Sequence, residues 1–165
     1  MKNAAGEDES NRHTVRMEPD QHDSRDFIIM IRALQAADVD NVADIWLSAN
    51  LQAHSFIPAE YWEGNLESVK SMLPQAEVYV YEDDHGIQGF IGLNGEHIEG
   101  IFVSGQLQSH GIGRRLMDYM KRRKAMLTLN VYQRNLRAIR FYLREGFKIQ
   151  REGLDAPTGE GEYVM

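Results

Sequence analysis

Apolar and polar positions along the chain follow two periods in succession, which predicts alternating strands and helices. Short apolar runs and period-two alternation favour strands at residues 27–33, 77–82, 87–93, 97–103, 126–132, 147–151 and 162–165. Helical spacing of apolar residues predicts four helices, which begin after Asp38, at Pro58, at Ile112 and after Asn135. This order predicts an α/β fold, with a mixed sheet of six to seven strands and helices on both faces.

Local signals set several of the expected helix boundaries. Asp38 and Asn135 are good N-cap residues, and Pro58 suits the first position of a helix. Gly146 is expected to end the last helix. The apolar face of that helix is predicted to include Leu136, Ile139, Phe141 and Leu143.

Composition narrows the class of protein. One domain over residues 27–165 accommodates the predicted elements, and the polar residues 1–26 are predicted to form a disordered tail. The chain has no cysteine, which excludes disulfides, thiolate zinc sites and a cysteine nucleophile and fits a cytoplasmic protein. The net charge of −7 argues against nucleic-acid binding. No apolar run reaches the roughly 20 residues of a membrane helix, so no membrane association is expected. A monomer and a homodimer are both compatible.

A glycine-bearing turn between the strand at 97–103 and the following helix is a candidate anion site. Gly111 and Gly113 let the backbone approach a ligand closely, and the first N–H groups of a helix are unpaired at the positive end of its dipole. That geometry suits a pyrophosphate. A dinucleotide-binding fingerprint would need a small residue where Leu116 stands, and no Gly-Lys-Ser/Thr occurs for a P-loop.

The remaining pattern, Gln108-x-x-Gly111-x-Gly113 between a strand and a helix, resembles the pyrophosphate loop of the GNAT superfamily of N-acetyltransferases. A second stretch, Asn135-x-x-Ala138-x-x-Phe141-Tyr142-x-x-x-Gly146-Phe147, is similar to the signature that follows the superfamily's fifth strand. The predicted order of elements matches the GNAT fold. More narrowly, residues 46–47, 54–57 and 61–62 are similar to small bacterial members, including lysine acetyltransferases.

The resemblance implies a binding site for acetyl-CoA between splayed fourth and fifth strands. Gln108 would brace the pyrophosphate loop, and the backbone of Phe102 and Val103 would pair with the pantetheine arm. Asn135 would also reach the pantetheine. The pyrophosphate would be bound by the amides of Ser109, His110, Gly111, Ile112, Gly113 and Arg114. Many relatives have a proline shortly after the position of Val103, where this chain has Ser104-Gly105.

Tyr142 is the first candidate catalytic residue, because a phenol of pKa about 10 can protonate the departing CoA thiolate at neutral pH. Packing against the sheet is the alternative. His97 is a candidate general base, since histone-type relatives place a glutamate fourteen residues before Gly111, and Glu99 and Glu160 are further candidates.

His54, Phe56 and Tyr61 are predicted to contribute to the acceptor site. The alternative for Phe56 and Tyr61 is a core role, and the alternative for His54 is a partly buried histidine that caps a turn. No metal is expected, because His97-x-Glu99 lacks the cysteine partners of zinc deaminases.

The predicted function is transfer of an acetyl group from acetyl-CoA to a primary amine in a ternary complex. The acceptor can be a protein lysine, an N-terminus or a small amine. Because the chain has no cysteine, a cysteinyl thioester intermediate is excluded, which favours direct attack. A non-catalytic acyl-CoA sensor is the main alternative, and use of another acyl group is a weaker one.

Overall fold

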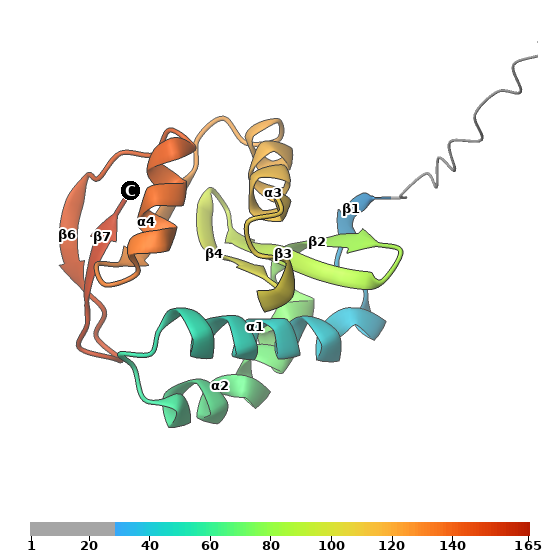
Figure 1. Ribbon diagram of the computed structural model, residues 1–165, viewed down its shortest axis with the longest axis horizontal. Coiled ribbons are helices and arrows are strands. Elements are labelled where there is room, and N and C mark those ends of the chain that lie inside the picture. The colour runs from blue at the N-terminus through green and yellow to red at the C-terminus, as the bar shows by residue number, and fades with distance from the viewer. Residues whose placement is uncertain (1–28) are drawn as a thin grey trace, which may run out of the picture.

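The structure, a computed structural model, describes residues 29–165 as one mixed sheet with helices on both faces (Figure 1). Its strands are β1 (Met30–Ala33), β2 (Glu77–Asp83), β3 (Gly86–Asn94), β4 (His97–Val103), β5 (Thr128–Tyr132), β6 (Arg151–Leu154) and β7 (Gly161–Val164). Its helices are α1 (Val39–Ala53), α2 (Ala59–Met72), α3 (Ile112–Lys121) and α4 (Leu136–Arg144). The predicted element order is confirmed. The predicted tail, residues 1–26, and the expected start of the first strand at Phe27 lie outside the described residues.

The seven strands lie in the order β1-β2-β3-β4-β5-β7-β6. All neighbours are antiparallel except β4 and β5, which α3 connects as a parallel pair. Helices α1 and α2 cover one face of the sheet, and α3 and α4 cover the other (Figure 1). Each face therefore has its own apolar core, and the parallel pair lies near the middle of the sheet.

The core on the α3 and α4 face is formed where these helices meet β3, β4 and β5. Its fully buried side chains include Ile91, Ile98, Leu116, Met117, Met120 and Leu129. Period-two alternation in the strands and helical spacing in α3 place these residues on one side of their elements, as the sequence pattern predicts. This core fixes α3 against β4, and so it fixes the loop that joins them.

The end of α4 explains why the strand predicted at 147–151 is wrong at its start, and only Arg151 of that range belongs to a strand. Gly146 has φ of +96° and donates to the carbonyl of Leu143, while the Phe147 amide donates to the carbonyl of Tyr142 at 3.0 Å. This is a Schellman motif, in which the residue after the glycine also packs on the third-last helical residue. The rings of Phe147 and Tyr142 accordingly lie 5.8 Å apart. Phe147 therefore completes the helix cap, and β6 begins only at Arg151.

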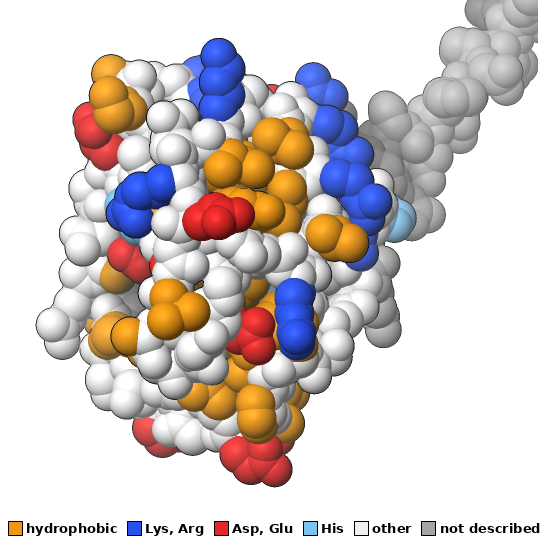
Figure 2. Space-filling view, turned by 90° about the vertical axis from the view of Figure 1, so that its left-hand side faces the viewer, with side chains coloured by type: hydrophobic (Ala, Val, Ile, Leu, Met, Phe, Trp, Pro, Cys, Tyr) orange, Lys and Arg blue, Asp and Glu red, His pale blue; other side chains and the backbone are white. Residues whose placement is uncertain are grey.

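The predicted apolar face of α4 is also partly wrong. Ile139 and Tyr142 are buried, whereas Leu136 is 61% exposed and Leu143 is 47% exposed. Figure 2 views the molecule from the side of β6, β7 and α4, where hydrophobic side chains are interspersed with charged ones. The row that contains Tyr142 faces the sheet, and spacing alone did not distinguish it from the neighbouring row with Leu136 and Leu143.

The predicted cap at Asp38 has a different role. Its carboxylate accepts from Arg32 Nη1 at 2.7 Å and from the Gln35 amide at 2.8 Å, and a 3-10 turn over Ala36–Asp38 precedes α1. The Arg32 guanidinium holds the pKa of Asp38 below its usual value. Among residues 29–165, no helix is long and apolar enough to cross a membrane.

Candidate active site

The strands β4 and β5 pair at only one end and then diverge. Only His97 with Thr128 and Ile98 with Leu129 are in register, although β4 continues to Val103 and β5 to Tyr132. The backbone edge of β4 from Ile101 to Val103 is therefore not paired with β5. We call this opening between β4 and β5 the wedge. Unpaired strand edges accept an added extended ligand through main-chain hydrogen bonds.

A bulge in β4 accompanies this divergence. Gly92 of β3 lies opposite Gly100, and Leu93 lies opposite Ile98, so Glu99 is an extra residue without a partner in β3. Bulges bend a strand and interrupt its alternation. Ile98 and Ile101 therefore both pack against the same core. In a regular strand, residues three positions apart would point to opposite faces of the sheet. The bend begins one residue after the last pair with β5, where the wedge opens.

The loop at the wide end of the wedge has the backbone geometry of an anion site. Ser109 and Gly111 have φ of +69° and +82°, and α3 begins immediately afterwards at Ile112. Left-handed residues beside a helix start turn successive N–H groups toward a common point. The amides of Ile112, Gly113 and Arg114 belong to the first turn of α3, which has no intrahelical acceptors for them. The amide of His110 donates to the Leu107 carbonyl at 3.3 Å, so it already has a partner.

Arg137, which the sequence did not single out, holds this loop from the other side of the wedge. Its guanidinium donates to Gln108 Oε1 and to Ser109 Oγ, each at 2.7 Å. Left-handed backbone at a non-glycine residue such as Ser109 costs about 1–3 kcal/mol, and these bonds offset part of that cost. An arginine in the first turn of a helix opposes the helix dipole, and this mismatch was the available sequence signal. The predicted Gln108 brace is therefore part of a larger contact.

Tyr142 lies on the buried side of α4, between the rings of Phe141 and Phe147. Burial raises the pKa of Tyr142 to about 12, so the hydroxyl is protonated at neutral pH. Within residues 29–165 the hydroxyl makes no hydrogen bond. Burial also raises the pKa of a CoA thiol held nearby. The difference between the pKa of Tyr142 and the pKa of that thiol therefore decides the direction of proton transfer. This location is compatible with both roles predicted for Tyr142, which are packing in the core and donating a proton.

Two of the three candidate bases lie close together in β4, and the third lies in another loop. His97 is at its closed end, where Nδ1 lies 2.9 Å from Thr128 Oγ1, and Glu99 is exposed at the bulge. Glu160 lies in the loop between β6 and β7 and faces Arg134 at 3.7 Å. The structure therefore places His97 and Glu99 together where the strands diverge, and it places Glu160 apart from them.

His54 sits at the end of α1 with both ring nitrogens in contact. Nδ1 lies 3.0 Å from Asn50 Oδ1, and Nε2 lies 3.0 Å from Asn135 Nδ2. The ring stacks on Trp62 and meets the edge of Tyr132. Burial lowers the pKa of His54 to about 4, so the imidazole is neutral at physiological pH. Neither nitrogen is left for a direct contact with an acceptor.

Acid should therefore destabilise the protein through His54. Its folded pKa of about 4 lies below the usual 6.5, so the unfolded chain takes up the proton first as the pH falls. The contribution is complete above pH 6.5 and is lost as the pH falls toward 4, by about 3 kcal/mol at most. Urea unfolding at several pH values measures this loss. The difference between wild type and His54→Gln isolates it, and an equal pH dependence of the two would contradict it.

The other predicted acceptor residues, Phe56 and Tyr61, are half-buried near the end of β5. Phe56 lies against Tyr132 at 5.8 Å between ring centroids, and Tyr132 donates to Asp155 Oδ2 at 2.8 Å. Burial, with a smaller contribution from Asp155, raises the pKa of Tyr61. An aromatic surface beside a carboxylate is suited to an alkyl chain that ends in a positive charge.

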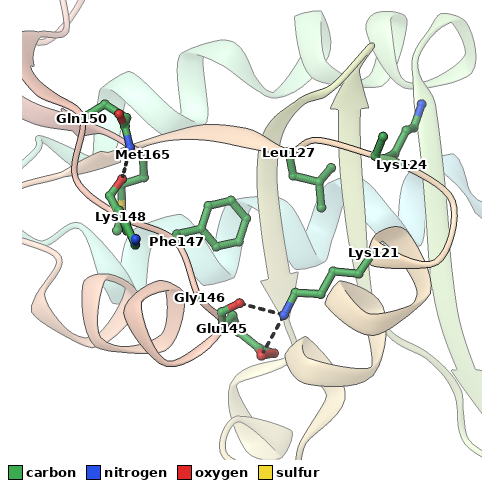
Figure 3. Close-up of a pocket in the computed structure, with 10 residues that line it drawn as sticks. Lys121, Lys124, Leu127, Glu145, Gly146, Phe147, Lys148, Gln150 and Met165 are labelled. Atoms are coloured by element: carbon green, nitrogen blue, oxygen red, sulfur yellow. Dashed lines mark hydrogen bonds and ion pairs between the residues drawn. The ribbon is translucent and has the colours of Figure 1, made fainter.

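A separate pocket lies at the opposite ends of α3 and α4 (Figure 3). It has a volume of about 390 Å³, and Phe147 and Leu127 lie between its lysines. Lys121 donates to the Glu145 carbonyl and contacts its carboxylate, while Lys124 pairs with Glu77. None of the candidate site residues lines this pocket, so it is not part of the wedge.

A parallel strand pair that opens beside a helix-terminal anion loop defines the class of protein: an acetyl-CoA-dependent acetyltransferase. Comparisons with known proteins agree. The acetyltransferase (GNAT) domain family matches residues 74–149. Peptidyl-lysine N-acetyltransferase YiaC of Escherichia coli is 35% identical over 122 residues, which are 73% of this chain and 84% of that protein.

Solved structures show the same fold. The apo form of YjaB from Escherichia coli superposes with a TM-score of 0.75 at 27% identity, over 83% of this chain and 95% of that one. PaiA N-acetyltransferase from Thermoplasma acidophilum, solved in complex with coenzyme A, gives 0.69 at 18% identity over 83% and 98% of the two chains. The chain belongs to the GNAT acetyltransferase family, so the predicted family, fold and enzyme class are confirmed.

Proposed function

We propose that the protein transfers the acetyl group of acetyl-CoA to the side-chain amine of a lysine in a peptide or protein. The observation that carries this proposal is the wedge beside the loop before α3. The unpaired edge of β4 leads directly to the anion site at the start of α3. The peptidyl-lysine acceptor is supported by YiaC and by YjaB, which carry that activity in their names. We expect a cytoplasmic protein, either a monomer or a homodimer.

The proposed cofactor contacts follow from the backbone. Ile112, Gly113 and Arg114 present free amides to the pyrophosphate, together with Ser109 and Gly111. The edges of Phe102 and Val103 pair with the pantetheine arm as an added strand would. The side chain of Asn135 has a second amide hydrogen that can reach the pantetheine, because only one is directed at His54. These contacts need no metal.

The proposed reaction is direct attack. The neutral lysine amine adds to the thioester carbonyl carbon, and the tetrahedral intermediate breaks its carbon–sulfur bond. The departing thiolate takes the proton of Tyr142, and the amine loses its proton to a base. His97 is the proposed base, directly or through water, with Glu99 as the alternative, because both lie where the strands diverge. An amide of β4 near Val103 can stabilise the oxyanion.

The proposed acceptor surface is formed by Phe56 and Tyr61, with the carboxylate of Asp155 close by. The apolar rings suit the aliphatic part of a lysine, and the carboxylate attracts its ammonium group before deprotonation. The net charge of −7 also favours a cationic partner.

The test uses matched peptides and acetyl-CoA. We expect thiol release and acetylation of a lysine peptide with a blocked N-terminus, and much less with the same peptide carrying arginine in place of lysine. Mass spectrometry of the fragments identifies the modified nitrogen. Binding of acetyl-CoA without transfer to any lysine peptide, free N-terminus or small amine would contradict the proposal and favour a sensor. Parallel reactions with propionyl- and succinyl-CoA show whether acetyl is the preferred group.

A further inference from the structure

The last turn of α1 touches both walls of the wedge. On the β4 side, a Cβ at Gly105 would lie only 2.8 Å from Gln52 Oε1, so the backbone after β4 rests directly on this side chain. On the β5 side, His54 reaches Asn135 in the turn that follows Tyr132. The two contacts stand two residues apart on one helix end.

The hydrogen bonds around His54 fix its protonation. Asn135 Oδ1 accepts from the Ala138 amide at 3.2 Å, so its Nδ2 must be the group that faces His54 Nε2. Asn50 Nδ2 donates to the Trp46 carbonyl at 2.9 Å, so its Oδ1 faces His54 Nδ1. The imidazole therefore carries its proton on Nδ1 and accepts at Nε2. These hydrogen bonds run without a break from the Trp46 carbonyl in α1, through Asn50, His54 and Asn135, to the Ala138 amide in the first turn of α4.

This series of hydrogen bonds joins elements on opposite faces of the sheet. Helix α1 covers one face and α4 the other, and a closed sheet would separate them (Figure 1). The connection passes the carboxyl end of β5, at the wide end of the wedge. Asn135 is the N-cap of α4, and Tyr142 follows seven residues later, two turns along the same helix face. A shift at the cap would therefore move Tyr142.

We propose that His54 is a positioning residue that sets the width of the wedge, by tying the N-cap of α4 to the end of α1. This inference rests on the proposed function, because the wedge is the proposed site of acetyl-CoA. His54 touches neither the acetyl group nor the acceptor in this account. It acts through Asn135, and Gln52 against Gly105 supports the other wall.

Two variants of His54 separate the effect of its hydrogen bond to Asn135 from the effect of its packing. Glutamine places its Oε1 near the position of Nε2 and can still accept from Asn135, whereas asparagine reaches only the position of Nδ1 and keeps the bond to Asn50. Both lose the ring that stacks on Trp62. We expect His54→Asn to weaken acetyl-CoA binding about tenfold, the effect of one lost hydrogen bond, and His54→Gln to stay within about threefold of wild type.

Calorimetry gives the dissociation constants, and thermal unfolding checks that the two variants are equally stable. Equal affinities of His54→Asn and His54→Gln for acetyl-CoA would overturn the proposal. If wild type itself binds no acetyl-CoA, the proposed function fails first, and that outcome is distinct from equal variants.

The tautomer provides a second test that needs no variant and no activity. Nitrogen chemical shifts of the histidine rings at neutral pH should show His54 protonated on Nδ1 and bare at Nε2. A His54 protonated on Nε2 would break the bond to Asn135 Nδ2 and contradict the proposal. The measurement stands even if a substitution prevents folding.

Discussion

Replacing Tyr142 with phenylalanine is expected to lower kcat about 100- to 1,000-fold while leaving the affinity for acetyl-CoA nearly unchanged. The hydroxyl is protonated at neutral pH because burial raises its pKa to about 12, and within the described residues it has no other partner. A positioned acid typically contributes a factor of this size. The ring still fills the space between Phe141 and Phe147, so the core is retained. Steady-state kinetics and calorimetry separate the two effects.

Tyr119→Phe in α3 is the matched control, because it removes a phenol hydroxyl from a half-buried ring outside the wedge. It should leave kcat unchanged. If Tyr142→Phe retains more than a third of wild-type turnover, proton donation by this residue is not required. Tyr142 would then have only the packing role that its burial already indicates.

Replacing Gly111 with valine should weaken acetyl-CoA binding at least 100-fold. Gly111 has φ of +82° immediately before α3, a conformation that a β-branched residue adopts only with strain. Relief of that strain would rotate the amides that the proposal assigns to the pyrophosphate. No atom lies within 4 Å of a Cβ built at this position, so the effect cannot come from a clash in the core.

Gly159→Val supplies the control for backbone strain alone. Gly159 has φ of +73° and equally open space around it, but it lies in the loop between β6 and β7. It should lose a similar amount of stability and keep its affinity for acetyl-CoA. Equal losses of affinity in the two variants would mean that strain, and not the anion loop, is responsible.

The sequence predicts the framework of the site well, because the relevant signals are local. The apolar run at 97–103 matches β4 residue for residue, and Asn135 caps α4 by accepting from the Ala138 amide. Gly146 ends α4 in a left-handed conformation, as a glycine at that position is expected to do. Each of these features depends on a few consecutive residues.

Long-range partners could not be predicted in this way. The role of Arg137 depends on a loop 28 residues away, and that of His54 depends on a turn 81 residues away. The wedge depends on where two strands stop pairing, although Ile98-Glu99-Gly100-Ile101 interrupts the alternation and could have indicated the bulge. At Phe147 the prediction failed because of a local signal. Phenylalanine favours strands, but here it completes the cap of α4.

The most direct test is a titration of nitrogen-labelled protein with acetyl-CoA, observed through the backbone amides. Binding in the wedge predicts saturable shift changes at Ile101–Val103 and at Ser109–Arg114, with little change at the pocket around Lys121 and Phe147. Unchanged spectra of well-folded protein, or changes confined to that pocket, would contradict the account.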